Sequence, residues 1–169
     1  VELTTAELLK NELYDRSDLK LFKDTWLPAF ESDEEMKQYW SKKVTAGRNR
    51  RENVDLFLQA FLLNQAGVSD DIRVSDLFSE YRAYLRLPVA PPRKTFIHDL
   101  TISARLYRDS LEPDLLDEPV DKTDVLHRLN LIVFGLQTTT ILPWILHVLR
   151  TVESSGTRED LLALTECYV

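Results

Sequence analysis

The sequence predicts an all-α protein, a helical bundle of about eight or nine helices in two lobes that share one core. Three observations favour this fold class. Apolar residues recur at helical spacing, as at Val54, Phe57, Leu58, Phe61 and Leu62. Side chains that can cap a helix N-terminus stand before several of these stretches. Glycine is scarce, with 4 residues in 169, and no long stretch alternates apolar with polar residues, so a sheet is not expected.

The N-terminal lobe is expected to span residues 1–87. Thr4 and Glu7 form a capping box at the start of the first helix, and the run that begins at Ser32 forms another. Ser75 is expected to cap a later helix. We therefore expect helices at about residues 4–15, 18–26, 33–40, 51–63 and 75–85, with a loop at residues 45–49.

Residues 88–92 contain three prolines and predict a linker, because proline lacks an N–H donor and disfavours the helical conformation in the residue before it. The C-terminal lobe then spans residues 93–169. Gly156 is expected to end one helix and Thr157 to start the last, with Leu161, Leu162 and Leu164 facing inward. Helices are expected at about residues 96–111, 122–135, 138–153 and from 157 onward.

One long apolar stretch raises the question of a membrane span. Residues 129–149 carry no formal charge over 21 residues, which is long enough to cross a bilayer. Asn130, Pro143 and His147 lie within it and would be costly in lipid. We therefore expect two buried helices that meet near Gly135, and no membrane partner.

The cysteine usage and the first residue bear on the setting of the chain. Cys167 is the single cysteine, which excludes an internal disulfide framework and fits a reducing compartment. The N-terminal sequence does not have the pattern of an export signal. Because the chain starts with Val1 rather than methionine, we expect it to be a segment of a longer protein.

The sequence contains no recognisable catalytic, cofactor or metal site. His98 and Asp99 are adjacent, but neighbouring residues on a helix point in different directions and do not form a dyad. His127 and His147 fall on successive helices, and no third metal ligand can be named beside them. The four glycines stand singly, and none precedes the Lys-Ser or Lys-Thr of a phosphate-binding loop.

A basic segment is the feature that points to a binding function. Residues 36–51 contain six basic and no acidic residues, in a chain whose net charge is −7. Cations on a flexible loop neutralise phosphates without reading the base sequence, and Tyr39 and Trp40 beside them can stack on an unpaired base. The alternative is that the charges are solvated helix ends and that the aromatic rings belong to the core. The candidate DNA-binding residues are Lys42, Lys43, Arg48, Arg50 and Arg51.

The opening run L-T-T-A-E-L-L-K-N at residues 3–11 resembles a signature of the GmrSD family of modification-dependent restriction systems. Further features are similar in kind and order: Trp40 at the end of an early helix, the Phe/Leu-rich helix at residues 51–63, and an apolar helix pair containing Pro143. The last five residues, T-E-C-Y-V, resemble the helix just before the family's nuclease domain. The resemblance spans the whole chain, and its specific part is the first eleven residues.

This resemblance implies a bacterial cytoplasmic protein that cuts foreign DNA bearing modified bases. Its parent would carry an N-terminal ParB/sulfiredoxin-like NTPase domain and a C-terminal HNH nuclease domain, which would use an NTP and a divalent metal. Neither the D-G-Q-Q-R motif nor a His–Asn–His constellation is present here. We therefore expect a non-catalytic helical region that connects those two domains and has duplex DNA as a candidate partner. The alternative is a helical protein–protein interaction module with no nucleic-acid role.

Overall fold

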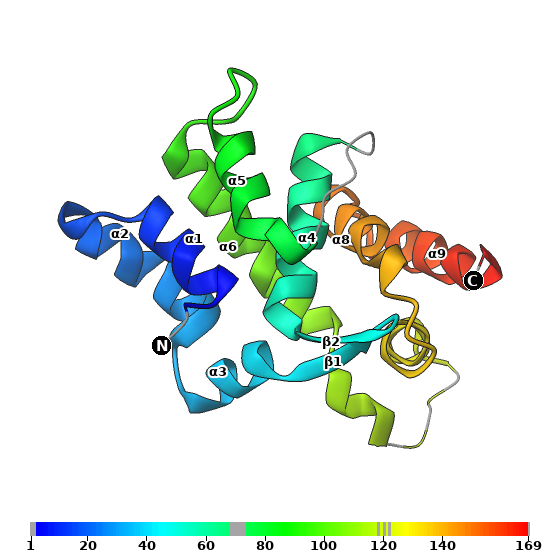
Figure 1. Cartoon of the computed structure of the whole chain (residues 1–169). Coiled ribbons are helices and arrows are strands. Elements are labelled where there is room, and N and C mark those ends of the chain that lie inside the picture. Colours follow the sequence, from blue (N-terminus) through cyan, green and yellow to red (C-terminus); the bar gives the residue numbers. More distant parts are fainter. Residues whose placement is uncertain (1–2, 68–73, 118, 120, 122, 169) are drawn as a thin grey trace.

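The computed structural model describes residues 3–67, 74–117, 119, 121 and 123–168 (Figure 1). Helices make up most of this part of the chain, and a single two-stranded hairpin accompanies them, so the all-α prediction is confirmed. The α-helices are α1 (Thr5–Leu13), α2 (Leu19–Asp24), α3 (Glu34–Ser41), α4 (Asn53–Ala66), α5 (Leu77–Leu85), α6 (Arg93–Ser110), α7 (Val125–Asn130), α8 (Leu142–Thr151) and α9 (Ser155–Thr165). The strands are β1 (Lys43–Ala46) and β2 (Asn49–Glu52), and two short π-helical turns lie at Leu27–Glu31 and Leu131–Gly135.

The caps explain where several helices begin. The Thr4 hydroxyl accepts the Glu7 N–H, and the Glu7 carboxylate accepts the Thr4 N–H at 2.8 Å, so the expected capping box of α1 is confirmed. The Asp33 carboxylate caps α3 by accepting the Met36 N–H at 2.8 Å. The expected cap at Ser75 is wrong, because a 3₁₀ turn at Val74–Asp76 leads directly into α5.

The start of the last helix also differs from the expectation. Ser154 caps α9 by accepting the Thr157 N–H, so the helix begins at Ser155 and Gly156 lies inside it instead of ending the previous helix. This shift changes which leucines face inward. Leu162 is buried as expected, whereas Leu164 is 54% exposed.

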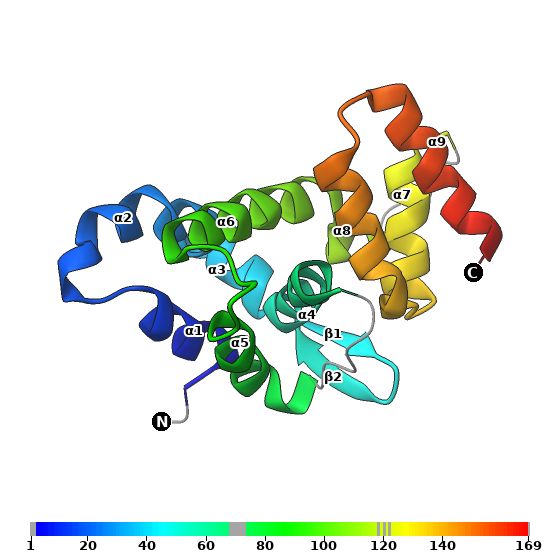
Figure 2. The ribbon, with the colours of Figure 1, turned by 90° about the horizontal axis from the view of Figure 1, so that it is seen from above.

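Helix α4 is the centre of the core. Seven of its apolar residues are buried, and they lie around most of the helix circumference. The helix packs against α1, α3, α5, α6 and α8 (Figures 1 and 2). A helix that is apolar on nearly all sides is expected in the interior of a protein, so this one is more deeply buried than its amphipathic spacing indicated. The buried residues are Val54, Leu56, Phe57, Leu58, Ala60, Phe61 and Leu62.

The proline segment at residues 88–92 is a non-helical connection between α5 and α6, as the prolines predicted. Buried residues from both sides of it belong to one hydrophobic cluster, in which α4 contacts α6 and α8. The expected sharing of one core is therefore observed, while the division into an N-terminal and a C-terminal lobe stays a prediction. In Figure 2, α7, α8 and α9 gather at one end of the molecule.

The uncharged segment at residues 129–149 folds back on itself. Leu129 and Val133 are buried on one side of the turn near Gly135, and Ile145 and Leu146 are buried on the other. In the part of the chain that the structure describes, none of the helices combines the length and apolarity that a bilayer span requires.

Candidate functional site

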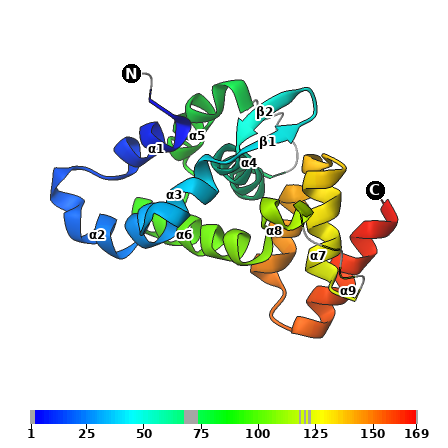
Figure 3. The ribbon, with the colours of Figure 1, turned by 90° about the horizontal axis from the view of Figure 1, so that it is seen from below.

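The basic segment forms a β-hairpin, so the expectation of a loop at residues 45–49 is wrong. Strands β1 and β2 pair antiparallel, with Val44 opposite Arg51 and Ala46 opposite Asn49. The chain reverses at Gly47 and Arg48, and Gly47 has a φ of +60°. Glycine tolerates this backbone conformation without strain, which explains a two-residue turn at this position. Figure 3 shows the hairpin at one edge of the molecule, beside α4.

One face of the hairpin is anchored to the core. Val44 is buried, and Ala46 packs against the same hydrophobic cluster. At the base of the hairpin, the Asn53 N–H donates to the Lys42 carbonyl at 2.8 Å. Because side chains alternate along a strand, Lys43 and Arg50 lie on the opposite face from Val44. The hairpin is therefore a fixed part of the fold that presents basic side chains outward.

The structure divides the five predicted DNA-binding residues into two groups. Lys43, Arg48 and Arg50 are exposed, and none of the ion pairs among the described residues involves them. Lys43 nevertheless stands opposite Glu52 in the hairpin, and its positive charge partly opposes the rise that burial causes in the pKa of Glu52. Arg50 also donates to the Lys43 carbonyl at 3.3 Å, which holds its guanidinium along the outer face.

Lys42 and Arg51 form the second group, because both are half-buried. The Lys42 ammonium pairs with the Asp114 carboxylate. Burial raises the pKa of Asp55, and the positive charge of Arg51 partly opposes this rise. The sequence grouped five cations, whereas the structure exposes three of them together.

The aromatic residues next to the basic segment belong to the core. Trp40 is 4% exposed, and its ring packs against Phe30, Phe57 and Tyr107. The hydroxyl of buried Tyr39 donates to the Leu111 carbonyl at 2.5 Å, and burial raises the Tyr39 pKa above its usual range. The alternative in which Tyr39 and Trp40 belong to the core is therefore confirmed, and these rings do not present a face to an unpaired base.

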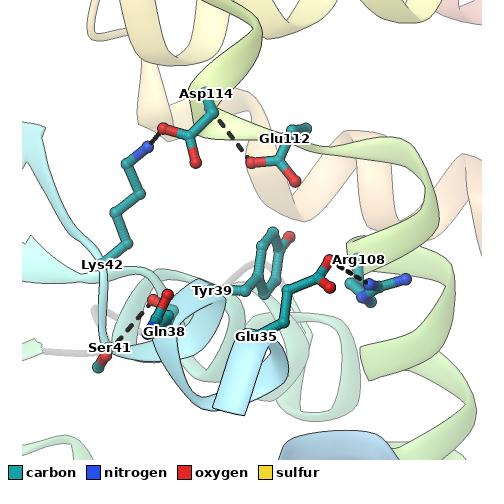
Figure 4. A pocket seen from close by; sticks show the side chains of 8 residues that line it. All are labelled: Glu35, Gln38, Tyr39, Ser41, Lys42, Arg108, Glu112 and Asp114. Carbon is teal, nitrogen blue, oxygen red and sulfur yellow. Dashed lines mark hydrogen bonds and ion pairs between the residues drawn. The ribbon is translucent and has the colours of Figure 1, made fainter. Parts of the chain in front are cut away.

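A cleft of about 380 Å³, which we call the polar cleft, lies beside the base of the hairpin (Figure 4). Lys42 reaches across it from the hairpin to Asp114, and Arg108 faces Glu35 at 3.6 Å. The Glu112 carboxylate accepts the Asp114 N–H at 3.2 Å. The polar cleft lies between α3, the C-terminal end of α6 and the 3₁₀ turn at Pro113–Asp117.

The polar cleft pairs opposite charges and does not assemble a catalytic set. Burial raises the pKa of Glu112, and the charges of Lys42 and Arg108 oppose this rise. The Tyr39 hydroxyl, which belongs to another lining residue, donates to the Leu111 carbonyl. Charge pairs of this kind position neighbouring segments and compete with an incoming anion for Lys42.

The histidines do not converge on a metal site. His98 is exposed, the His127 Nδ1 accepts the Asp121 N–H at 3.2 Å, and His147 stacks on Trp144 near the surface. Over the described ranges, no group of three histidine, cysteine or acidic side chains is placed to hold a metal ion.

Two features of this region were not predicted from the sequence. Asn53 looks like an ordinary polar residue, yet it is fully buried and connects the hairpin to α3 and α6. Asp114 belongs to an acidic stretch, and its partner Lys42 is far away in the chain. Neither contact leaves a signal in local sequence, because both depend on how distant segments pack.

Comparison with known proteins finds no family model, curated protein or solved structure that matches this chain.

Proposed function

We propose that this chain is a non-catalytic helical scaffold that contacts the phosphates of duplex DNA through its basic hairpin. The observation that carries the proposal is the exposure of Lys43, Arg48 and Arg50 together on a hairpin whose other face is anchored to the core. These three cations lie in residues 36–51, which contain no acidic residue, although the chain as a whole carries −7. Glu52, at the end of β2, is the one acidic residue of the hairpin strands and stands opposite Lys43. The basic surface is therefore local.

The physical basis is electrostatic. Each phosphate that a lysine or arginine neutralises releases condensed counterions, which favours binding at low salt and is independent of base sequence. A pre-formed hairpin limits the backbone ordering needed on binding, because hydrogen bonds and Val44 already hold it in place. The acidic remainder of the surface repels DNA and favours approach by this edge.

The resemblance at residues 3–11 places this scaffold in a larger setting. We propose that the chain is the region between the NTPase and nuclease domains of a GmrSD-type restriction protein in the bacterial cytoplasm. The NTP and the divalent metal would then belong to the flanking domains. Determining the parent reading frame tests this part: a D-G-Q-Q-R motif upstream and an HNH motif downstream support it, and the absence of both refutes it.

The hairpin is tested by charge reversal. Binding to a fluorescently labelled duplex of about 20–30 base pairs, a length that exceeds the footprint of one module, is measured by anisotropy at several salt concentrations. The test variant carries Lys43→Glu, Arg48→Glu and Arg50→Glu. The control carries Lys20→Glu, Lys23→Glu and Arg105→Glu, which make the same change in net charge at exposed positions away from the hairpin.

We expect the hairpin variant to lose duplex binding and the control to retain most of it. The slope of the logarithm of the binding constant against the logarithm of the salt concentration should become shallower by about two to three. Three phosphate contacts are removed, and each contributes about 0.9 to this slope. Circular dichroism checks that both variants keep their helices. Equal binding by all three proteins, or no binding by the unmodified chain, would refute the hairpin proposal and favour the protein–protein interaction module.

A further inference from the structure

A second cleft, which we call the aromatic cleft, lies between the C-terminal end of α4 and the first half of α8. Its volume is about 570 Å³, larger than that of the polar cleft, and most of its wall is apolar. The residues used below are Leu63, Asn64, Thr140, Pro143, Trp144 and His147. None of these side chains takes part in the hairpin or in the polar cleft.

Two near-parallel rings line the aromatic cleft. Trp144 is 46% exposed, and its Nε1–H donates to the Thr165 hydroxyl at 3.0 Å, which fixes the orientation of the indole. The His147 ring lies close to parallel with it, at an interplanar angle of 27° and a centroid distance of 6.2 Å. Fixed rings of one orientation offer a π face on which another flat ring can stack. Leu63 and Pro143 supply apolar contacts around them.

Asn64 adds a directed polar group. Its amide nitrogen donates to the Ala60 carbonyl at 3.1 Å and to the Pro143 carbonyl at 3.0 Å, so both amide hydrogens are used. These bonds identify the other amide atom as oxygen, and among the described residues that oxygen accepts no hydrogen bond. It is therefore an acceptor of a cleft-lining residue that remains available to a donor. The exposed Thr140 hydroxyl stands at the same cleft.

We propose that the aromatic cleft binds a flat heteroaromatic ring that carries an amino group, the chemistry of an adenine or cytosine base. The ring stacks on the Trp144–His147 pair, and its amino group donates to the Asn64 Oδ1. A purely apolar ligand would leave the Asn64 acceptor without a partner, and an anion would find no lysine or arginine among the described lining residues. The same ring chemistry is present in a free nucleoside and in an unpaired base of a strand. The inference is independent of the hairpin, because a nucleoside carries no phosphate.

Trp144 reports on this cleft selectively. Trp26 and Trp40 are 1% and 4% exposed, so iodide quenches mainly the fluorescence of Trp144. Adenosine, cytidine, uridine and ribose are each titrated into the protein, and protection of Trp144 from iodide is measured. Adenosine and cytidine should give saturable protection at lower concentration than uridine, whose ring lacks the amino group, and ribose should give none.

Three variants locate the binding, with affinity measured by calorimetry so that Trp144 itself can be replaced. Trp144→Leu and His147→Ala should each weaken adenosine binding by about fivefold or more, the effect expected from losing one stacking partner. Leu136→Ala is the matched control, because Leu136 is an exposed apolar residue of the same end of the molecule that does not line the cleft. The hairpin charge variant should bind adenosine normally, so failure of this inference and failure of the hairpin proposal are distinguishable.

Single-stranded and duplex oligonucleotides of the same sequence separate the two sources of the ring. Protection by free adenosine at a similar concentration to the strand identifies a nucleoside site, and protection by the single strand at far lower concentration identifies an unpaired-base site. The inference is overturned if adenosine and cytidine give no saturable protection, if uridine or ribose protects equally well, or if Trp144→Leu binds as tightly as Leu136→Ala.

Discussion

Replacing Asn53 tests how the start of α4, at the base of the hairpin, is linked to α3 and α6. Asn53 is 0% exposed and is the first residue of α4, directly after β2. Its backbone N–H donates to the Lys42 carbonyl, and its side-chain amide donates to the Tyr39 carbonyl at 3.4 Å. Its side-chain oxygen accepts the hydroxyl of Tyr107 at 3.0 Å. Asn53 thus meets the base of the hairpin through its backbone and meets α3 and α6 through its side chain.

The structure sets the size of the effect. Asn53→Ala leaves the Tyr107 hydroxyl, which is also 0% exposed, without this acceptor. A buried donor that loses its partner costs about 1–3 kcal/mol, so we expect the free energy of unfolding to fall by roughly 2 kcal/mol. Tyr107→Phe removes the hydroxyl and should cost about 1 kcal/mol. The double variant has no stranded hydroxyl, so its loss should be smaller than the sum of the single losses by roughly 1 kcal/mol.

Urea unfolding followed by helical circular dichroism measures these free energies. Tyr81→Phe supplies the control cycle, because the Tyr81 hydroxyl donates to the Leu58 carbonyl at 2.7 Å and shares no hydrogen-bond partner with Asn53. Asn53→Ala combined with Tyr81→Phe should be additive to within about 0.5 kcal/mol. If the Asn53 and Tyr107 variants are equally additive, the two side chains do not depend on each other and the proposed link from α4 to α6 through Asn53 is refuted.

Three further measurements test other parts of the structure. Thr4→Ala should lower the free energy of unfolding by about 1 kcal/mol through loss of the α1 cap, and NMR titration should show the pKa of Glu7 rising, because bonds from Thr4 hold it low. Burial raises the pKa of Asp55 above its ordinary value of 3.8, so the folded state keeps this proton to higher pH than the unfolded state. The contribution of Asp55 to stability is then lost as pH rises from 3.8 through the folded value, and Asp55→Asn should be more stabilising, relative to the unmodified protein, at pH 7 than at pH 3 in urea titrations. Asp114→Asn frees Lys42 and should strengthen duplex binding in the anisotropy assay, with a stability change below about 1 kcal/mol.

The helices were predictable because their signals are local. A capping box such as that of Thr4 and Glu7 needs four residues, and the apolar spacing of α4 needs fewer than ten. Neither kind of signal depends on distant parts of the chain. Two local signals competed before the last helix, a cap at Ser154 and a helix end at Gly156. In the structure Ser154 caps α9, and Gly156 lies inside that helix.

The hairpin was not predictable in the same way. A half-buried strand usually shows alternating apolar and polar residues, but only Val44 and Ala46 supply apolar contacts to the core here. Strand β2 contains no apolar residue at all. The hairpin forms because Gly47 permits its turn and because the core of the molecule provides a surface for Val44. That surface is formed by segments that are distant in the sequence, so the local pattern does not indicate it.

The charged residues of the candidate site could be predicted from the sequence only in part, for the same reason. Sequence identified every basic residue of the hairpin, but it did not identify which of them have acidic neighbours. Lys42 and Asp114 meet because α3 packs near the end of α6, and the pairing depends on that packing. Burial of Tyr39 and Trp40 likewise follows from the position of α3 against α4. A cluster of cations in sequence is therefore an upper limit on the cations that are available to a ligand.

Lys42 provides the test of that limit. Under the proposed function, Lys43, Arg48 and Arg50 are exposed to meet phosphates directly, whereas Lys42 must first leave Asp114. An ion pair between partly exposed side chains contributes at most about 1 kcal/mol, so this competition weakens the contribution of Lys42 without abolishing it. The salt dependence of duplex binding should therefore correspond to about three phosphate contacts in the unmodified protein and approach about four in Asp114→Asn. If Asp114→Asn instead binds with an unchanged slope, Lys42 does not reach the DNA even when it is free, and the DNA contact is confined to the outer face and the turn of the hairpin.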